Sequence, residues 1–238
     1  NIIASGKQYT TVGRDFTVKV DARIPNKFAG QKVFYRFAAE GVYSQIGTTF
    51  TLPEDVENFK LAVFSCSNYP AGYFNAYNSA SKDKSIDMAI HLGDYLYEYK
   101  QGEYATENSI SLNRQPIPNK EIITLSDYRQ RHAQYKSDMD LQKLHSTMPV
   151  LCAWDDHEIT NDAWKNNAEN HQLNEGSFSL RKRNAIKAYY EWMPVREPKI
   201  SFNNWKRYKI GKLIDLKLLE TRISSRSKHC LLYTSDAA

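Results

Sequence analysis

Three short apolar runs, each followed directly by a cluster of polar and charged residues, constrain the fold of this chain more than any other feature. They lie in FKLAVFSCSNY (59–69), IDMAIHLGDYLYEY (86–99) and MPVLCAWDDHEITND (148–162). Each run has the length of a strand, and helical patterns occupy 126–148 and 177–194. Strands that alternate with helices indicate an α/β core, in which ligands bind beyond the carboxyl ends of the strands. We therefore expect the three clusters to converge on one site.

The second cluster, HLGDYLYEY (91–99), carries a carboxylate and a phenol three residues apart. If the chain turns helically there, Asp94 and Tyr97 face the same way. A carboxylate can bridge two cations, and hard oxygen donors suit hard, highly charged metals. The alternative is that Asp94 caps a helix while Tyr97 packs as an aromatic edge, because short motifs often match by chance.

The third cluster, WDDHE (154–158), concentrates charge directly after a strand. Adjacent carboxylates repel and raise one another's pKa unless a cation or hydrogen-bond donors neutralise them. His157 is a candidate ligand or a general acid for a leaving group. The alternative is a solvated loop in which Asp155 or Asp156 caps a helix.

The first cluster contains Cys66, which is either a thiolate ligand or a small buried hydrophobe. Cys152 lies inside its apolar run, and we expect it in the core. We also expect His91 to pack within or beside its strand. The polar segment 100–125 is long, which is typical of a lid over a site or of an exposed insertion.

The first ~50 residues show the alternation of short strands, at 15–24 and 31–52. Short strands with glycine turns suggest a small β-sandwich, which we interpret as a structural module. The character of the chain changes after Pro53, so the sequence predicts a boundary there.

Charge and cysteine content exclude several classes of protein. The net charge of +5 over 238 residues comes without a long basic run, which argues against a nucleic-acid partner. Three cysteines do not make a disulfide framework. No stretch approaches the ~20 apolar residues of a membrane span. The chain starts at Asn1, as if upstream sequence had been removed, so the compartment is not readable from a signal peptide.

Four blocks, in order, resemble the PhoD-type alkaline phosphatases, a branch of the calcineurin-like metallophosphoesterases. They are FSCSNYPAGYFNAY, HLGDYLYEY, ITLSDYRQRHAQYKSD and WDDHEITND. The resemblance implies an α/β (overall α+β) architecture with an N-terminal immunoglobulin-like β-domain at 1–54. A metallophosphoesterase-type αββα sandwich, incomplete at its C-terminus, would follow at 55–229. Residues 230–238, CLLYTSDAA, have no counterpart in the family, and we interpret them as a non-native tail that resembles a translated sequencing adaptor.

The resemblance also implies chemistry. The family hydrolyses phosphate monoesters and diesters with a ferric ion and calcium (Fe3+ and Ca2+). By resemblance, Cys66, Asp94 and Tyr97 bind the iron, Asp94 bridges to the second cation, and Asp156 is a further ligand. His157 would contact the substrate or leaving group. The partners would be small phosphate esters or phosphodiester polymers, met by an exported monomer. The weaker candidates for the site are Asp155 and Asn161.

Two departures from the family limit this expectation. Glu220 stands where an aspartate is expected, and no late Gly-Asp-x-His block appears after Glu158. We therefore expect these residues to form part of an active site that is inactive alone. The alternative is a non-catalytic extracellular module that binds phosphorylated ligands.

Overall fold

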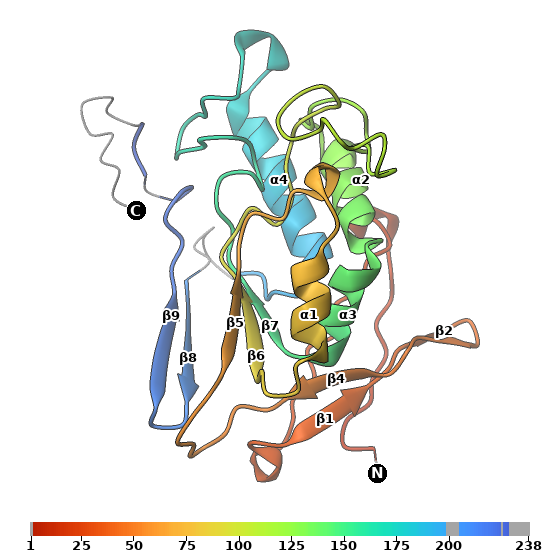
Figure 1. Ribbon diagram of the computed structural model, residues 1–238, viewed down its shortest axis with the longest axis vertical. Helices are drawn as coiled ribbons and strands as arrows, with labels where there is room; N and C mark the ends of the chain where they lie inside the picture. The colour runs from red at the N-terminus through yellow and green to blue at the C-terminus, as the bar shows by residue number, and fades with distance from the viewer. Residues whose placement is uncertain (1, 199–204, 225, 229–238) are drawn as a thin grey trace.

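A three-stranded parallel sheet lies at the centre of the computed structural model, which describes residues 2–198, 205–224 and 226–228 (Figure 1). Its order is β5 (Leu61–Phe64), β6 (Met88–His91) and β7 (Val150–Cys152). Phe64 is level with His91, and His91 with Cys152, so the three strands end at one edge. The three predicted strands and the α/β class are confirmed.

Four helices form the main apolar core with one face of this sheet (Figure 1). Ala62 and Phe64 of β5 turn toward them. The sequence predicted one helix over 126–148, but the structure has two. The chain breaks because Asp138 accepts hydrogen bonds from the N–H groups of Asp140 and Leu141, both at 3.0 Å, and so caps a new helix. The helices are α1 (Asn75–Lys82), α2 (Leu125–Lys136), α3 (Met139–Thr147) and α4 (Phe178–Trp192).

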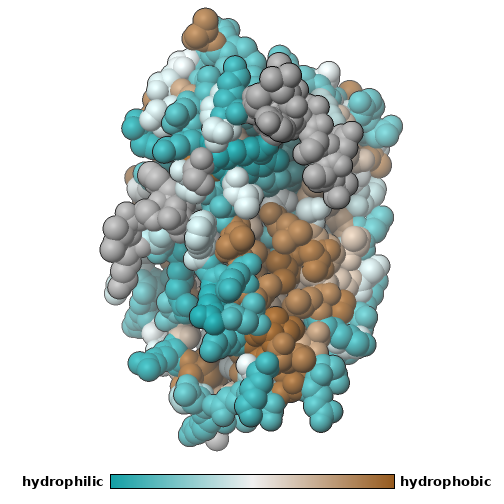
Figure 2. Space-filling view, turned by 90° about the vertical axis from the view of Figure 1, so that its left-hand side faces the viewer, coloured by the Kyte–Doolittle hydropathy of each residue, from teal (hydrophilic) through white to brown (hydrophobic). Residues whose placement is uncertain are grey.

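A separate antiparallel hairpin, β8 (Lys206–Ile210) and β9 (Ile214–Leu218), covers part of the other face of the sheet. Leu216 and Leu218 pack there beside Ile90 and Ala153. The cover is incomplete, since Val63, which alternates with the inward-facing residues of β5, is 56% exposed. Figure 2 views this side of the molecule and shows a band of hydrophobic residues on it.

Residues 2–54 contain two short antiparallel pairs, and the structure describes no second sheet facing them. The expected immunoglobulin-like sandwich is therefore not confirmed, and the strand expected at 15–24 is wrong, because that segment has no strand partner. The division at residue 54 remains a prediction. The pairs are β1 (Lys32–Tyr35) with β4 (Gly47–Phe50), and β2 (Ala38–Ala39) with β3 (Val42–Tyr43).

The N-terminal segment instead reaches the end of α4 through side chains. Lys19 donates hydrogen bonds to the carbonyl oxygens of Tyr190 and Val195, the second at 2.9 Å. The indole N–H of Trp192 donates to Asp15 at 3.1 Å. Some polar groups of the N-terminal segment thus find their hydrogen-bond partners in the α/β part of the chain. Short 3₁₀ helices occupy Val12–Arg14, Asn26–Phe28, Tyr69–Ala71 and Leu173–Glu175.

Residues 230–238 and Cys230 lie outside the described residues. Within the part that the structure describes, helices are too short or too polar to cross a bilayer.

Candidate metal centre

The three clusters meet at the carboxyl edge of the sheet. The N–H groups of Cys66 and Ser67 donate to the carbonyl oxygens of Gly93 and Asp94, at 3.2 and 2.8 Å. The N–H of Ala153 donates to the carbonyl of His91 at 2.9 Å. The exits of neighbouring strands therefore run side by side, and the predicted convergence of the clusters is confirmed.

Gly93 permits this close approach. Its φ is +126°, and a Cβ there would lie 2.3 Å from the backbone nitrogen of Asp155, so no other residue fits. The candidate ligands on either side are conformationally unusual as well, since Cys66 has φ of 60° and Asp94 has φ of 54°. Left-handed backbone at a non-glycine residue costs about 1–3 kcal/mol and is concentrated at functional sites.

Asp94 lies close to all the other candidate ligands. Its Oδ2 is 3.4 Å from the sulfur of Cys66 and 3.5 Å from the hydroxyl of Tyr97. Ligand atoms of Asp94, Asp156 and His157 all lie within 4.8 Å of one another. The Oδ1 atom of Asp94 is buried and has no hydrogen-bond partner among the described residues. A carboxylate that is close to four other candidate ligands and has an unpaired buried oxygen fits a bridging ligand.

Burial raises the pKa of Asp94 and also that of Asp156. Acidic neighbours raise the pKa of each carboxylate further, and the charge of His157 lowers it. Burial likewise raises the pKa of the Cys66 thiol and of the Tyr97 phenol. A bound cation would favour the ionised form of all four groups, because metal ligands bind deprotonated. The carboxylates of Asp94 and Asp156 and the phenolate of Tyr97 suit a hard, highly charged cation, whereas the thiolate of Cys66 is a softer donor.

A fully buried carboxylate, Glu98, positions His157, and sequence analysis missed it. Its Oε2 lies 2.7 Å from Nδ1 of His157, and its Oε1 accepts from the N–H of Asn161 at 2.7 Å and from Thr160 at 3.1 Å. Burial alone would lower the pKa of His157, but the hydrogen bond and charge of Glu98 raise it to about 9. The only available signal was an acidic residue four positions after Asp94.

Glu158 holds the second and third strand exits together. Its carboxylate accepts from the N–H groups of Asp94 at 3.2 Å, Tyr95 at 2.7 Å and Asp155 at 2.8 Å. Burial raises the pKa of Glu158 to about 8, although these three donors lower it. Glu158 thus acts through the backbone of the candidate ligands.

Arg222, also missed by sequence analysis, lies beside the acidic cluster. Its guanidinium is 2.5 Å from Asp155 and 3.5 Å from both Asp156 and Asp162. The preceding turn is closed by Glu220, whose carboxylate accepts the N–H groups of Arg222 at 2.7 Å and of Ser224 at 2.9 Å. The ion pair of Asp155 with Arg222 makes it a poorer candidate ligand than Asp156.

Cys152 and His91, which were predicted to pack, do so, and Tyr95 packs near them. Tyr95 is 1% exposed, its hydroxyl lies 2.9 Å from Nε2 of His145, and Cys152 is buried. His91 is buried beneath the site, where its Nε2 lies 2.8 Å from the hydroxyl of Ser67. Asn161 contributes its backbone N–H to Glu98.

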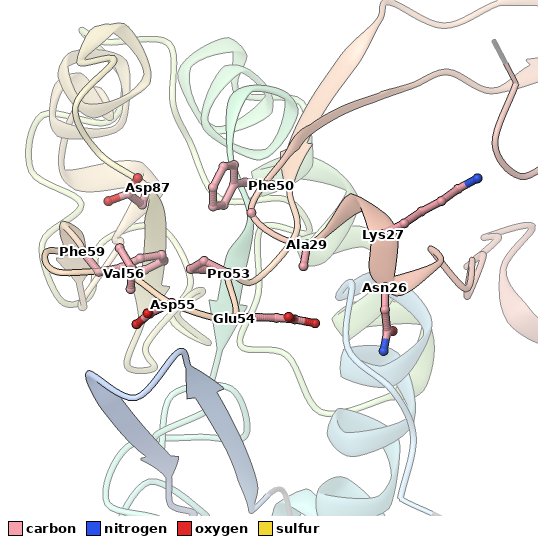
Figure 3. Close-up of a pocket in the computed structure, with 11 residues that line it drawn as sticks. Asn26, Lys27, Ala29, Phe50, Pro53, Glu54, Asp55, Val56, Phe59 and Asp87 are labelled. Carbon is pink, nitrogen blue, oxygen red and sulfur yellow. The ribbon is translucent and has the colours of Figure 1, made fainter.

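A cavity of about 590 Å³ lies away from this centre (Figure 3). Phe59 and Asp87, which line it, precede β5 and β6, so the cavity is at the opposite edge of the sheet from the clusters. Pro53 and Glu54, from the junction with the N-terminal segment, form another part of its wall. We assign no chemistry to it.

The fold and the site define an α/β protein with a cluster of metal-type ligands at the carboxyl ends of parallel strands. The family model of PhoD-like phosphatases matches residues 61–238. This chain therefore belongs to the PhoD-like phosphatase family.

Two comparisons agree with this assignment. The chain is 38% identical over 212 residues to alkaline phosphatase D of Bacillus subtilis (strain 168), covering 86% of this chain and 35% of that protein. A solved structure described as "Structure of PhoD" is similar with a TM-score of 0.74 and 36% identity, over 84% of this chain and 38% of that one. The chain thus spans little more than a third of the length of these relatives.

Proposed function

We propose that this site belongs to a phosphoric ester hydrolase that acts on phosphate monoesters and diesters. The observation that carries the proposal is the position of Asp94, whose carboxylate has Cys66 and Tyr97 on one side and forms a group with Asp156 and His157. The substrates would be small phosphate esters or phosphodiester polymers. The protein would be exported and would act as a monomer. The similarity to alkaline phosphatase D supports the reaction class.

In this proposal Cys66, Asp94 and Tyr97 hold a ferric ion, and Asp94 shares a calcium ion with Asp156. When bound, the two cations would polarise the phosphoryl oxygens and supply a hydroxide for attack on phosphorus. Thiolate and phenolate on ferric iron absorb visible light, so the iron-loaded protein should be coloured. We expect Tyr97→Phe to weaken or shift that band, which absorption spectroscopy measures. A colourless protein with iron bound would contradict both ligands.

His157 would donate a proton to the departing oxygen. Glu98 occupies its Nδ1, which leaves Nε2 as the nitrogen that faces a substrate. The hydrogen bond and the charge of Glu98 raise the pKa of the ring, which favours the protonated form that a general acid requires. The buried carboxylate also fixes the ring orientation, because its other oxygen is held by the N–H of Asn161.

The test separates metal binding from turnover. The full chain, its Asp94→Ala variant and its His157→Asn variant are each dialysed against Fe3+ and Ca2+, and bound metal is measured. We expect Asp94→Ala to lose both metals, because a bridging carboxylate touches each, and His157→Asn to keep them. Retention of iron and calcium by Asp94→Ala would refute the bridge.

Turnover is measured with an aryl phosphate, both for the chain and for a chimera in which it replaces the matched region of alkaline phosphatase D. In the chimera we expect each substitution to reduce hydrolysis by at least about 100-fold, the usual contribution of a general acid. A chimera that binds phosphate esters and metals without turnover would instead favour a non-catalytic binding module.

A further inference from the structure

A tyrosine of the long segment 100–124 lies against the candidate metal centre while most of its ring faces solvent. Tyr104 is 59% exposed. Its ring stacks on that of Tyr97, with centroids 6.0 Å apart and planes at 21°, and lies 5.4 Å from the ring of Tyr99. A large exposed aromatic ring beside candidate ligands is unlike the packed tyrosines at the base of the site.

The rings form an ordered series that leads from the general acid to solvent. His157 contacts Tyr97 at 4.2 Å and Tyr99 at 5.7 Å between ring centroids. Tyr104 contacts the same two tyrosines and adds a third ring. The leaving group that receives a proton from His157 would therefore emerge beside Tyr97 and Tyr99, with Tyr104 next along its path.

The segment that presents Tyr104 is fixed in place, so it is neither a free insertion nor an unattached lid. The fully buried guanidinium of Arg131 donates to the carbonyl oxygens of Tyr97, Ile117 at 3.0 Å and Pro118 at 3.1 Å. Arg114, also buried, pairs with Asp138 at 2.8 Å. These anchors bind the segment to α2 and to the start of α3.

The turn around Tyr104 is equally well defined. The hydroxyl of Thr106 accepts from the N–H of Gly102 at 2.9 Å and donates to the carbonyl of Glu103 at 2.7 Å. Ala105 has φ of 55°, a conformation that a non-glycine residue adopts only when its surroundings impose it. Buried hydrogen bonds thus hold the turn, and the exposed ring of Tyr104 is not needed to close it.

We propose that Tyr104, with Tyr99, forms an aromatic wall that makes the site prefer phosphate esters whose leaving group carries a flat aromatic ring. Aromatic faces attract other aromatic faces in offset or edge geometry, and a ring already held in place loses little entropy when a ligand stacks on it. Aryl esters and nucleotide esters share this chemistry. Esters of small alcohols have no face to offer. The inference rests on the proposed function, since it concerns the leaving group of that reaction.

The experiment compares two phosphonates that the enzyme cannot hydrolyse. Phenylphosphonate and methylphosphonate carry the same acid group and differ in the ring. Their binding to the full chain with Fe3+ and Ca2+ is measured by calorimetry, for the wild type and for Tyr104→Phe, Tyr104→Leu and Tyr104→Ala. Tyr43→Ala, which removes an exposed tyrosine from β3 in the N-terminal part, is the matched control.

We expect the wild type to bind phenylphosphonate more tightly than methylphosphonate. Tyr104→Ala and Tyr104→Leu should weaken the binding of phenylphosphonate about three- to tenfold, as expected for one lost aromatic pair. The binding of methylphosphonate should not change. Tyr104→Phe and Tyr43→Ala should behave as the wild type.

Each other outcome is decisive. Equal weakening of both phosphonates by Tyr104→Ala would show a structural role, and wild-type behaviour of Tyr104→Leu would show that apolar bulk suffices. Either result overturns the aromatic wall. If neither the wild-type chain nor its chimera with alkaline phosphatase D binds either phosphonate, the proposed function fails and the inference fails with it.

Discussion

The α/β part of the chain and the N-terminal segment 2–54 differ in how their polar groups find hydrogen-bond partners. Around the sheet, buried backbone groups pair with one another, and buried carboxyl groups such as that of Glu158 accept hydrogen bonds from backbone N–H groups within the site. In residues 2–54 the pairs are short, and side chains such as Lys19 reach across to the carbonyl groups at the end of α4. The α/β part finds its hydrogen-bond partners mainly within itself. Residues 2–54 pair partly with one another and partly with the α/β part.

The largest effect is expected where the buried carboxyl group of Glu158 holds the α/β part together. Glu158→Gln replaces one acceptor oxygen with a donor that faces backbone N–H groups, so at least one buried hydrogen bond is lost. We expect the free energy of unfolding in urea to fall by about 2–4 kcal/mol. Gln130→Glu, which makes the reverse exchange at an exposed position of α2, is the comparison variant and should leave the stability unchanged. Unchanged stability of Glu158→Gln would mean that the strand exits do not need this carboxylate.

An intermediate effect is expected at Lys136 of α2. Its ammonium donates to the hydroxyl of Tyr95 at 2.6 Å, and burial lowers its pKa from 10.5 to about 8. Between these pH values the unfolded chain binds the proton and the folded chain does not, so stability rises with pH. Relative to Lys136→Met, the wild type should gain about 2–3 kcal/mol across that window. Parallel pH profiles for the two proteins would contradict the lowered pKa.

The smallest effect is expected where the N-terminal segment contacts α4. Lys19→Met removes the hydrogen bonds to Tyr190 and Val195 but keeps the apolar stem. We expect a loss of about 1 kcal/mol, measured by thermal unfolding, together with faster proteolysis near residue 19. Lys7→Met, in the exposed start of the chain, should change neither property. A loss as large as that of Glu158→Gln would erase the difference between the two regions.

The sequence patterns predicted the sheet and the meeting of the clusters, because an apolar run of strand length leaves few alternatives to a buried strand. The same patterns failed for residues 15–24. Alternation there matched a strand, but a strand requires a neighbour to pair with, and alternation contains no information about whether one exists. The break at Asp138 was missed for a related reason: the helical pattern continues through it, and only the local hydrogen bonds of the carboxylate end one helix and begin the next.

The sequence predicted the candidate metal ligands of the site. It did not predict the groups that orient those ligands. Glu98 and Arg222 carry no motif of their own, and they matter only because folding brings them to His157 and to the acidic cluster. The roles of Cys66, Asp94, Tyr97, Asp156 and His157 remain predictions that the metal-loading experiments test.

The anchoring of segment 100–124 by Arg131 has a consequence for how this site can change over generations. The acceptors that Arg131 engages are main-chain carbonyl oxygens, at Tyr97, Ile117, Pro118 and Lys120. Every amino acid supplies such an oxygen, so the path of the segment does not depend on the identity of the side chains it bears. Substitutions at Tyr104 and its exposed neighbours can therefore accumulate without displacing the candidate metal ligands. The exposed side chains beside the site can therefore change under selection while the backbone path and the candidate ligands stay constant.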